Sequence, residues 1–216
     1  MSQQTALAEL LLEFLEAGIH EFIYGWQIYP KELFELCQKY DVPVHACRHP
    51  LLSAYIETML QSCKPWILDG RVDKISIAVL AATGQLLDTC VFEVGVNVNW
   101  RAEIPVTSLE EAFRRSLVQI SSAPSLVVAP AGDPFTKSFR LYLDTLEASG
   151  SPETLVPANG TENSWVTTHD EAAPMEGSLF PIASTVPTLP LRLNVYVIHA
   201  PPFSLQARRD QPTETP

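Results

Sequence analysis

The chain has 216 residues, which is enough for one well-buried domain with a flexible tail and short for two full domains. Hydrophobic residues make up 46% and charged residues 18%, so we expect a packed core and exclude a disordered chain. The net charge of −11 repels phosphate, which argues against direct binding of nucleic acid.

The cysteines and the N-terminus indicate a soluble protein of the cytosol or nucleus. The four cysteines lack the spacing of a disulfide framework, so we expect reduced thiols that serve packing. Near the N-terminus, Glu9, Glu13 and Glu16 interrupt the apolar residues, and no basic segment precedes them. This pattern fits neither a signal peptide nor a membrane span.

The first part of the chain is predicted to be helical. Apolar residues recur at helical spacing over residues 5–24, in a stripe wide enough to face a core. Pro30 interrupts this pattern. We expect the chain to restart there as a short helical turn through Leu33, Phe34 and Leu36.

Two further helices are predicted. One begins at His49-Pro50, with proline at a favourable first position, and ends before Pro65. The other continues through Ile120, and Thr107 and Glu110 have the spacing of a capping box at its start.

Strands are predicted where apolar and polar residues alternate. This pattern covers residues 75–79, and the turn at Thr83-Gly84 leads into a hairpin partner over residues 86–98. The same alternation recurs over residues 139–143 and 191–197. The element order predicts an α+β domain with three long helices and a few strands.

Residues 147–190 differ in composition from the rest of the chain. They are rich in Pro, Ser, Thr, Gly and acidic residues, with isolated large side chains such as Trp165 and Phe180. A segment of this length without regular structure is usually mobile or functional. Trp165 is then either a local anchor tucked into the domain or part of a binding surface.

One cluster raises the possibility of a metal site. In an extended strand, His45, Cys47 and His49 would share one face and could ligate zinc. The alternative is a cap-region His49 beside ordinary residues, because no distant fourth ligand is evident. No phosphate-binding loop, G-x-S-x-G elbow or H-E-x-x-H motif accompanies the cluster.

Opposite charges cluster on the predicted third helix. Glu110-Glu111 precede Arg114-Arg115 at helical spacing. Such a pattern is either an interaction patch or, more often, a solvated helix face.

Several short stretches of the sequence form a recognisable set. They are Glu13-Phe14-Leu15-Glu16, Tyr29-Pro30 with Phe34, Lys39-Tyr40-Asp41-Val42-Pro43-Val44, His49-Pro50 with Tyr55-Ile56, Lys64-Pro65, the strand at 72–80, and Val91-Phe92-Glu93-Val94. Together they resemble the HORMA-domain family, and within it the accessory, non-catalytic subunits of translesion DNA polymerase zeta. The resemblance is specific over residues 8–125 and extends to the strand at 139–143.

The resemblance implies a HORMA domain over residues 1–200 and a mechanism of peptide capture. Three long helices would pack on a mainly antiparallel sheet, with a core of residues 1–146 and a mobile safety belt of residues 147–200. A Pro-rich disordered tail would follow at 201–216. The belt would close over a partner's extended peptide, which is strand addition with a lid, and release would then be slow.

The resemblance also implies partners. The trapped peptide would be a proline-containing segment of the catalytic subunit of polymerase zeta, and a second surface would bind the C-terminal domain of another translesion polymerase. A HORMA-HORMA dimer and an AAA+ remodelling ATPase are further candidate partners. We expect a role in DNA damage tolerance and a location in the nucleus and also the cytoplasm. We expect no catalytic residue, metal or cofactor.

Five residues are assigned roles by the resemblance. Tyr55 and Trp165 would form part of the peptide-binding wall, Asn194 and Tyr196 the second partner surface, and Arg114 the HORMA-HORMA pairing helix. Tyr55 could equally be a buried helix aromatic, and Tyr196 an ordinary outward strand residue.

Two other functions stay open at this stage. A spindle-checkpoint HORMA regulator would have the same fold and different partners. Asp41-Val42-Pro43-Val44 together with His49-Pro50 favours the polymerase subunit over it. The alternative outside the family is a small zinc protein or metal-dependent enzyme.

Overall fold

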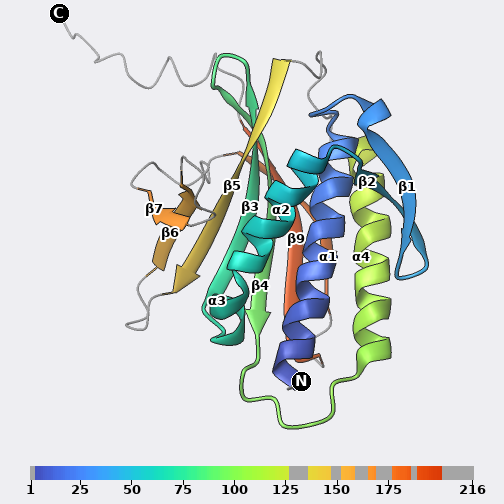
Figure 1. Cartoon of the computed structure of the whole chain (residues 1–216), viewed down its shortest axis with the longest axis vertical. Helices are drawn as coiled ribbons and strands as arrows, with labels where there is room; N and C mark the ends of the chain where they lie inside the picture. Colours follow the sequence, from blue (N-terminus) through green and yellow to red (C-terminus); the bar gives the residue numbers. More distant parts are fainter. Residues whose placement is uncertain are drawn as a thin grey trace, which may run out of the picture.

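A computed structural model describes residues 3–126, 136–146, 152–158, 165–168, 177–185 and 189–200. The predicted tail at 201–216 lies outside these residues. A seven-stranded sheet with neighbouring strands antiparallel carries the helices in front of one face in Figure 1. The helices are α1 (Gln3–Gly25), α2 (Pro50–Ser62), α3 (Lys64–Leu68) and α4 (Val106–Leu126).

The strand order of the sheet is β7-β6-β5-β3-β4-β9-β8. The strands are β3 (Val72–Ala81), β4 (Leu86–Val96), β5 (Lys137–Leu146), β6 (Pro152–Pro157), β7 (Trp165–Thr167), β8 (Ser178–Ser184) and β9 (Leu191–His199). The last strand therefore lies beside β4 in the interior of the sheet, although it is far from β4 in sequence. A separate hairpin of β1 (Phe34–Lys39) and β2 (Val42–Cys47) lies beside α1 and α4 in Figure 1.

Aromatic side chains from helices and sheet fill the centre of the core. Phe14 of α1 stacks on Phe113 of α4 with ring centroids 4.6 Å apart, and Phe92 of β4 meets Phe14 edge-on at 6.4 Å. All three are fully buried. The helix-spaced and strand-spaced apolar residues of the sequence therefore converge on one core, as their periodicity predicts.

The periodic elements agree with the sequence, and two local predictions are wrong. Phe34 and Leu36 lie in strand β1, and the helical turn before them covers only Lys31–Leu33. Helix α4 already begins at Val106, so Thr107 lies inside the helix and cannot be its N-cap. The hairpin turn explains the first error, because Tyr40 and Asp41 both have positive φ, 50° and 59°, as a tight two-residue hairpin turn requires.

The segment 147–190 is not structureless where the structure describes it, because strands β6, β7 and β8 lie within it. These strands lie toward the two edges of the sheet, where backbone pairing can stabilise a strand without an apolar face. Leu179 and Phe180 of β8 are exposed, and Pro181 is accommodated next to a register shift in this edge strand. The division into core and mobile belt at residue 146 stays a prediction.

Across the described ranges, no helix is long and apolar enough to span a membrane.

Candidate peptide-binding site

Strand β5 is paired along only part of one side. It pairs with β3 from end to end, but with β6 only over residues 143–146. Within the described residues, the stretch Ser138–Tyr142 has no strand on that second side. Such a stretch offers a row of backbone groups to which an extended chain can add.

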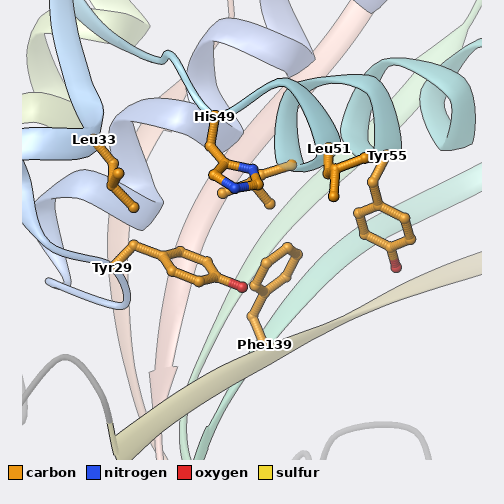
Figure 2. Close-up of a pocket in the computed structure, with 7 residues that line it drawn as sticks. Tyr29, Leu33, His49, Leu51, Tyr55 and Phe139 are labelled. Carbon is orange, nitrogen blue, oxygen red and sulfur yellow. The ribbon is translucent and has the colours of Figure 1, made fainter.

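An apolar pocket lies beside this open stretch. Its volume is about 460 Å³. Phe139 rises from β5 between the rings of Tyr29 and Tyr55, with His49 and Leu51 of the α2 end above it (Figure 2). The lining residues are Tyr29, Leu33, His49, Leu51, Leu52, Tyr55 and Phe139.

The three aromatic rings form the wall of the pocket. Tyr29 and Tyr55 each meet Phe139 with ring centroids 6.2 Å apart, at interplanar angles of 83° and 64°. Edge-to-face packing of this kind fixes ring orientation without filling the space between the rings. The pocket can therefore take an apolar side chain from a peptide that lies along β5.

Both tyrosine hydroxyls stay protonated at neutral pH. Burial raises the pKa of Tyr29, and the nearby Cys47 acts in the same direction. Burial also raises the pKa of Tyr55, while the charge of Arg140 on β5 opposes the shift. Each hydroxyl can therefore donate a hydrogen bond to a carbonyl oxygen of a bound chain.

Trp165 lies on β7, at the other end of helix α2 from the pocket. Its indole Nε1 donates a hydrogen bond to the Ser62 Oγ at 2.7 Å, and the ring is half-buried against the core. Ser62 follows Tyr55 by two helical turns, about 10 Å along α2. Tyr55 and Trp165, which are expected to form one wall, are thus both connected to α2. Tyr55 lies in this helix and lines the pocket, whereas Trp165 bonds to the other end of the helix.

Asn194 and Tyr196 lie on the face of the sheet opposite the helices. They alternate along β9 with the buried residues Leu193, Val195 and Val197. The Asn194 Oδ1 accepts a hydrogen bond from the Ser184 Oγ at 2.7 Å. Burial raises the pKa of Tyr196, and neighbouring carboxylates, Glu93 first, add to this effect. The two side chains are partly exposed and share one face, as a common surface requires.

Arg114 is tied to the β1–β2 hairpin. Its Nη2 lies 2.6 Å from the Asp41 Oδ2, and its Nε donates to the Tyr40 carbonyl at 2.8 Å. The neighbouring Arg115 donates to the backbone of Glu111 at 3.4 Å. Arg114 also lines a groove of about 640 Å³ between α4 and β8. The charged helix face thus contacts both a hairpin turn and an open groove.

The zinc hypothesis finds no support in the described residues. His45 directs its Nδ1 to the Glu21 Oε2 at 3.1 Å and stacks on Tyr24, whereas Cys47 is buried and His49 lines the pocket. No group of three or more His, Cys, Asp or Glu side chains in the described ranges is arranged to hold a metal ion. All four cysteines are free thiols, and three are buried, consistent with packing roles.

Most of the pocket was not predicted from the sequence. Tyr29 was identified only as part of a Tyr-Pro motif, and Phe139 only as a strand residue. The strand alternation over residues 139–143 did place Phe139 on the same face as Leu141, but nothing local to the sequence indicates that this face meets Tyr29. The missing information is the order of the strands.

No family model matches the chain. It is 31% identical over 133 residues to the mitotic spindle assembly checkpoint protein MAD2B of Danio rerio, covering 60% of this chain and 63% of the relative. It is 26% identical over 126 residues to the DNA polymerase zeta processivity subunit of Arabidopsis thaliana, covering 58% and 59%. The chain thus spans less than two thirds of the length of these relatives.

Solved structures share the fold at low sequence identity. A chain of the mitotic checkpoint complex superposes with a TM-score of 0.69 at 14% identity, over 90% of this chain and 99% of that one. HTP-2 of C. elegans bound to the HIM-3 closure motif gives 0.62 at 11%, over 89% of both chains. These structures confirm the expected α+β fold, and the sequence relatives confirm the expected resemblance.

Proposed function

We propose that this chain, which has the HORMA fold and is similar in sequence to MAD2B and to the processivity subunit of DNA polymerase zeta, is a non-catalytic adaptor of translesion synthesis. It traps a proline-containing peptide of the polymerase zeta catalytic subunit and bridges it to a second translesion polymerase. The half-open edge of β5 beside the aromatic pocket is the observation that supports this proposal most directly.

The open stretch of β5 suits an extended peptide. Residues 138–142 offer about 17 Å of strand, at roughly 3.4 Å per residue, whose second side has no partner strand among the described residues. Main-chain hydrogen bonds to this edge supply affinity, while the pocket at Phe139 selects a side chain. The belt, residues 147–200, then covers the bound peptide and slows its release.

The pocket chemistry suits proline. Its walls are mostly aromatic and aliphatic, so the pyrrolidine ring is buried without stranding a polar group. Proline has no backbone N–H to leave unpaired, and it fixes the peptide backbone in a conformation compatible with an edge strand. The Tyr29 and Tyr55 hydroxyls are available to nearby peptide carbonyls.

The remaining partners follow from the same assignment. Asn194 and Tyr196 contact the C-terminal domain of the second polymerase, and Arg114 contributes to pairing with another HORMA domain. An AAA+ ATPase opens the belt. The protein is not an enzyme, needs no cofactor, and works in the nucleus, with a further pool in the cytoplasm.

A spindle-checkpoint regulator is the second candidate. It is favoured by the name of the Danio rerio relative and by the superposition on a mitotic checkpoint complex chain. The two functions differ in the peptide bound, since the second requires a segment of a checkpoint or anaphase-promoting-complex component.

Binding and dissociation kinetics test the proposal. The probe is a fluorescent synthetic peptide spanning the proline-containing segment of the polymerase zeta catalytic subunit. We expect tight binding with slow release by the full chain, and affinity at least about tenfold weaker for Tyr55→Ala and for Trp165→Ala. Val118→Ala is the matched control, because Val118 is an exposed apolar residue on α4, outside both the pocket and the belt.

Two outcomes would overturn the assignment. A full chain that ignores this peptide but captures a checkpoint peptide supports the second candidate. If Val118→Ala weakens binding as much as Tyr55→Ala does, the peptide does not lie along the pocket.

A further inference from the structure

A buried carboxylate joins three segments at one end of the molecule. Asp88 of β4 is fully buried, and its Oδ2 accepts a hydrogen bond from the Trp26 indole Nε1 at 2.9 Å. Its Oδ1 lies 2.6 Å from the His199 Nδ1. Trp26 follows the end of α1, and His199 ends β9. Figure 1 shows the end of α1, the starts of β4 and β5 and the end of β9 at the same end of the sheet.

Lys137 brings a fourth segment into this cluster. Its Nζ donates a hydrogen bond to the backbone carbonyl of Trp26 at 3.2 Å, and its charge interacts electrostatically with Asp88. Burial lowers the pKa of Lys137, and Asp88 acts in the opposite direction. A carboxylate without solvent access is stable only when it is paired, so Asp88 depends on these partners for its position.

Two residues around Asp88 are close in sequence to the two pocket rings Tyr29 and Phe139. Trp26 precedes Tyr29 by three residues, through a turn in which Gln27 has φ 50° and the Ile28 amide bonds back to the Ile23 carbonyl at 3.1 Å. Lys137 precedes Phe139 by two residues on β5. The backbone leading to both rings of the Tyr29–Phe139 pair is therefore held by groups around Asp88.

We infer that Asp88 is a positioning residue for the peptide site, linking the docked end of β9 to the Tyr29 and Phe139 rings. When β9 is docked, His199 holds one carboxylate oxygen, and the other oxygen is fixed for Trp26. Loss of the His199 contact lets the carboxylate turn and loosens Trp26, and with it the Tyr29 side of the pocket. The inference rests on the proposed function, because the pocket matters only if a peptide occupies it.

A substitution series at His199 tests this link. His199→Leu removes the contact, whereas His199→Asn places an amide N–H where the ring Nδ1 stood. The His199 side chain is 40% exposed, so neither change creates a large cavity. Glu93→Gln is the matched control, since Glu93 lies on β4 outside the belt and also ties β9 to β4, through Arg192 at 3.2 Å, but at the far end of the strand.

We expect release of the proline-containing polymerase zeta peptide to be about fivefold faster in His199→Leu, which corresponds to about 1 kcal/mol. Release should return toward the original rate in His199→Asn and stay unchanged in Glu93→Gln. Equal acceleration by His199→Leu and Glu93→Gln would mean that His199 only anchors the strand, and would overturn the inference. Unchanged release in His199→Leu would overturn it as well.

A second readout needs no peptide. In NMR spectra of the free full chain, His199→Leu should shift the Trp26 indole N–H and the ring resonances of Tyr29 and Phe139, whereas Glu93→Gln should not. If the rings do not respond, the inference fails even where the peptide binds. If the rings respond but the unmodified chain ignores the peptide, the proposed function fails and the structural link stands.

Discussion

Two buried carboxylates hold two different parts of this molecule to its core. Glu21 of α1 is 2% exposed and accepts the His45 backbone N–H at 2.7 Å, with the His45 ring at 3.1 Å. Asp88 of β4 is fully buried and meets the Trp26 indole and the His199 ring. Glu21 secures the β1–β2 hairpin, and Asp88 secures the last strand of the sheet.

The difference between them lies in their partners. Glu21 bonds to a backbone N–H only 24 residues away, so its main contact persists whatever side chain occupies position 45. Among the described residues, the Asp88 carboxylate bonds to two side chains, which lie 62 and 111 residues away in sequence. The hairpin contact is therefore a short loop closure, whereas the Asp88 contacts need the whole sheet. Changing one partly exposed side chain, His199, therefore weakens the Asp88 contacts, whereas no change of side chain at position 45 removes the backbone bond to Glu21.

The largest effect is expected for Asp88→Ala. The change leaves the buried Trp26 N–H without an acceptor, removes the hydrogen-bond partner of the His199 ring and takes a negative charge away from Lys137, so we expect a loss of about 3–4 kcal/mol in the free energy of unfolding. Urea denaturation measures it. Asp88→Asn keeps an acceptor for Trp26 and should lose less. A loss below about 1 kcal/mol for Asp88→Ala would contradict the role assigned to this carboxylate.

Acid should weaken the hairpin contact through His20. Burial lowers the pKa of His20 to about 4, and its Nδ1 accepts the Cys47 backbone N–H at 3.3 Å. Since the unfolded chain takes up this proton near pH 6.5, the folded state loses stability as the pH falls from about 6.5 to 4, by about 3 kcal/mol in total.

Urea midpoints measured between pH 7 and pH 4 check this acid effect. His20→Asn keeps an acceptor near the Cys47 N–H and removes the titration, so its stability should vary less over the same range. An equal slope in both proteins would assign the acid sensitivity to another group.

A smaller loss is expected for Glu21→Gln. The amide oxygen can still accept the His45 N–H, but the charge is gone, and we expect a loss of about 1–2 kcal/mol. Glu13→Gln makes the same change on the same helix at an exposed ion pair with Lys39, and should cost under about 0.5 kcal/mol. Thermal unfolding of both variants measures the two losses of stability. Equal losses would show that burial of Glu21 does not strengthen its contacts.

The smallest expected effect is a gain in stability. Gln27 is exposed and has φ 50°, a conformation that glycine adopts without strain, so Gln27→Gly should stabilise the fold by about 0.5–1 kcal/mol. Gln38→Gly, in an ordinary strand conformation, should destabilise it. Calorimetry distinguishes the two signs.

Periodicity predicted the elements that contribute a face to the core. Helices α2 and α4 and strand β9 bury mainly one stripe or face, so their apolar spacing is visible in the sequence. The second half of α1 and the centres of β3 and β4 are buried on both sides. Strands β6, β7 and β8 were missed. Their side chains are mostly exposed or half-buried where described, and backbone pairing, which leaves no pattern in side-chain polarity, stabilises them.

The candidate site was predictable only in part. Tyr55 was identified through resemblance, and it does line the pocket, whereas its role in peptide binding stays a prediction. Phe139 stands opposite Tyr29 because β5 lies beside β3, and that order is set by which strands pair. Strand pairing depends on contacts between distant residues, so no local pattern encodes it.

The sequence by itself determined the α+β class, the long helices and the core strands, because burial of one face requires a regular spacing of apolar residues that can be read along the chain. Only the tertiary structure decided that Asp88 meets Trp26 and His199, and that the half-open edge of β5 lies beside Tyr29 and Tyr55. These contacts join residues that are far apart in sequence, and their energies depend on a geometry that exists only once the sheet has assembled.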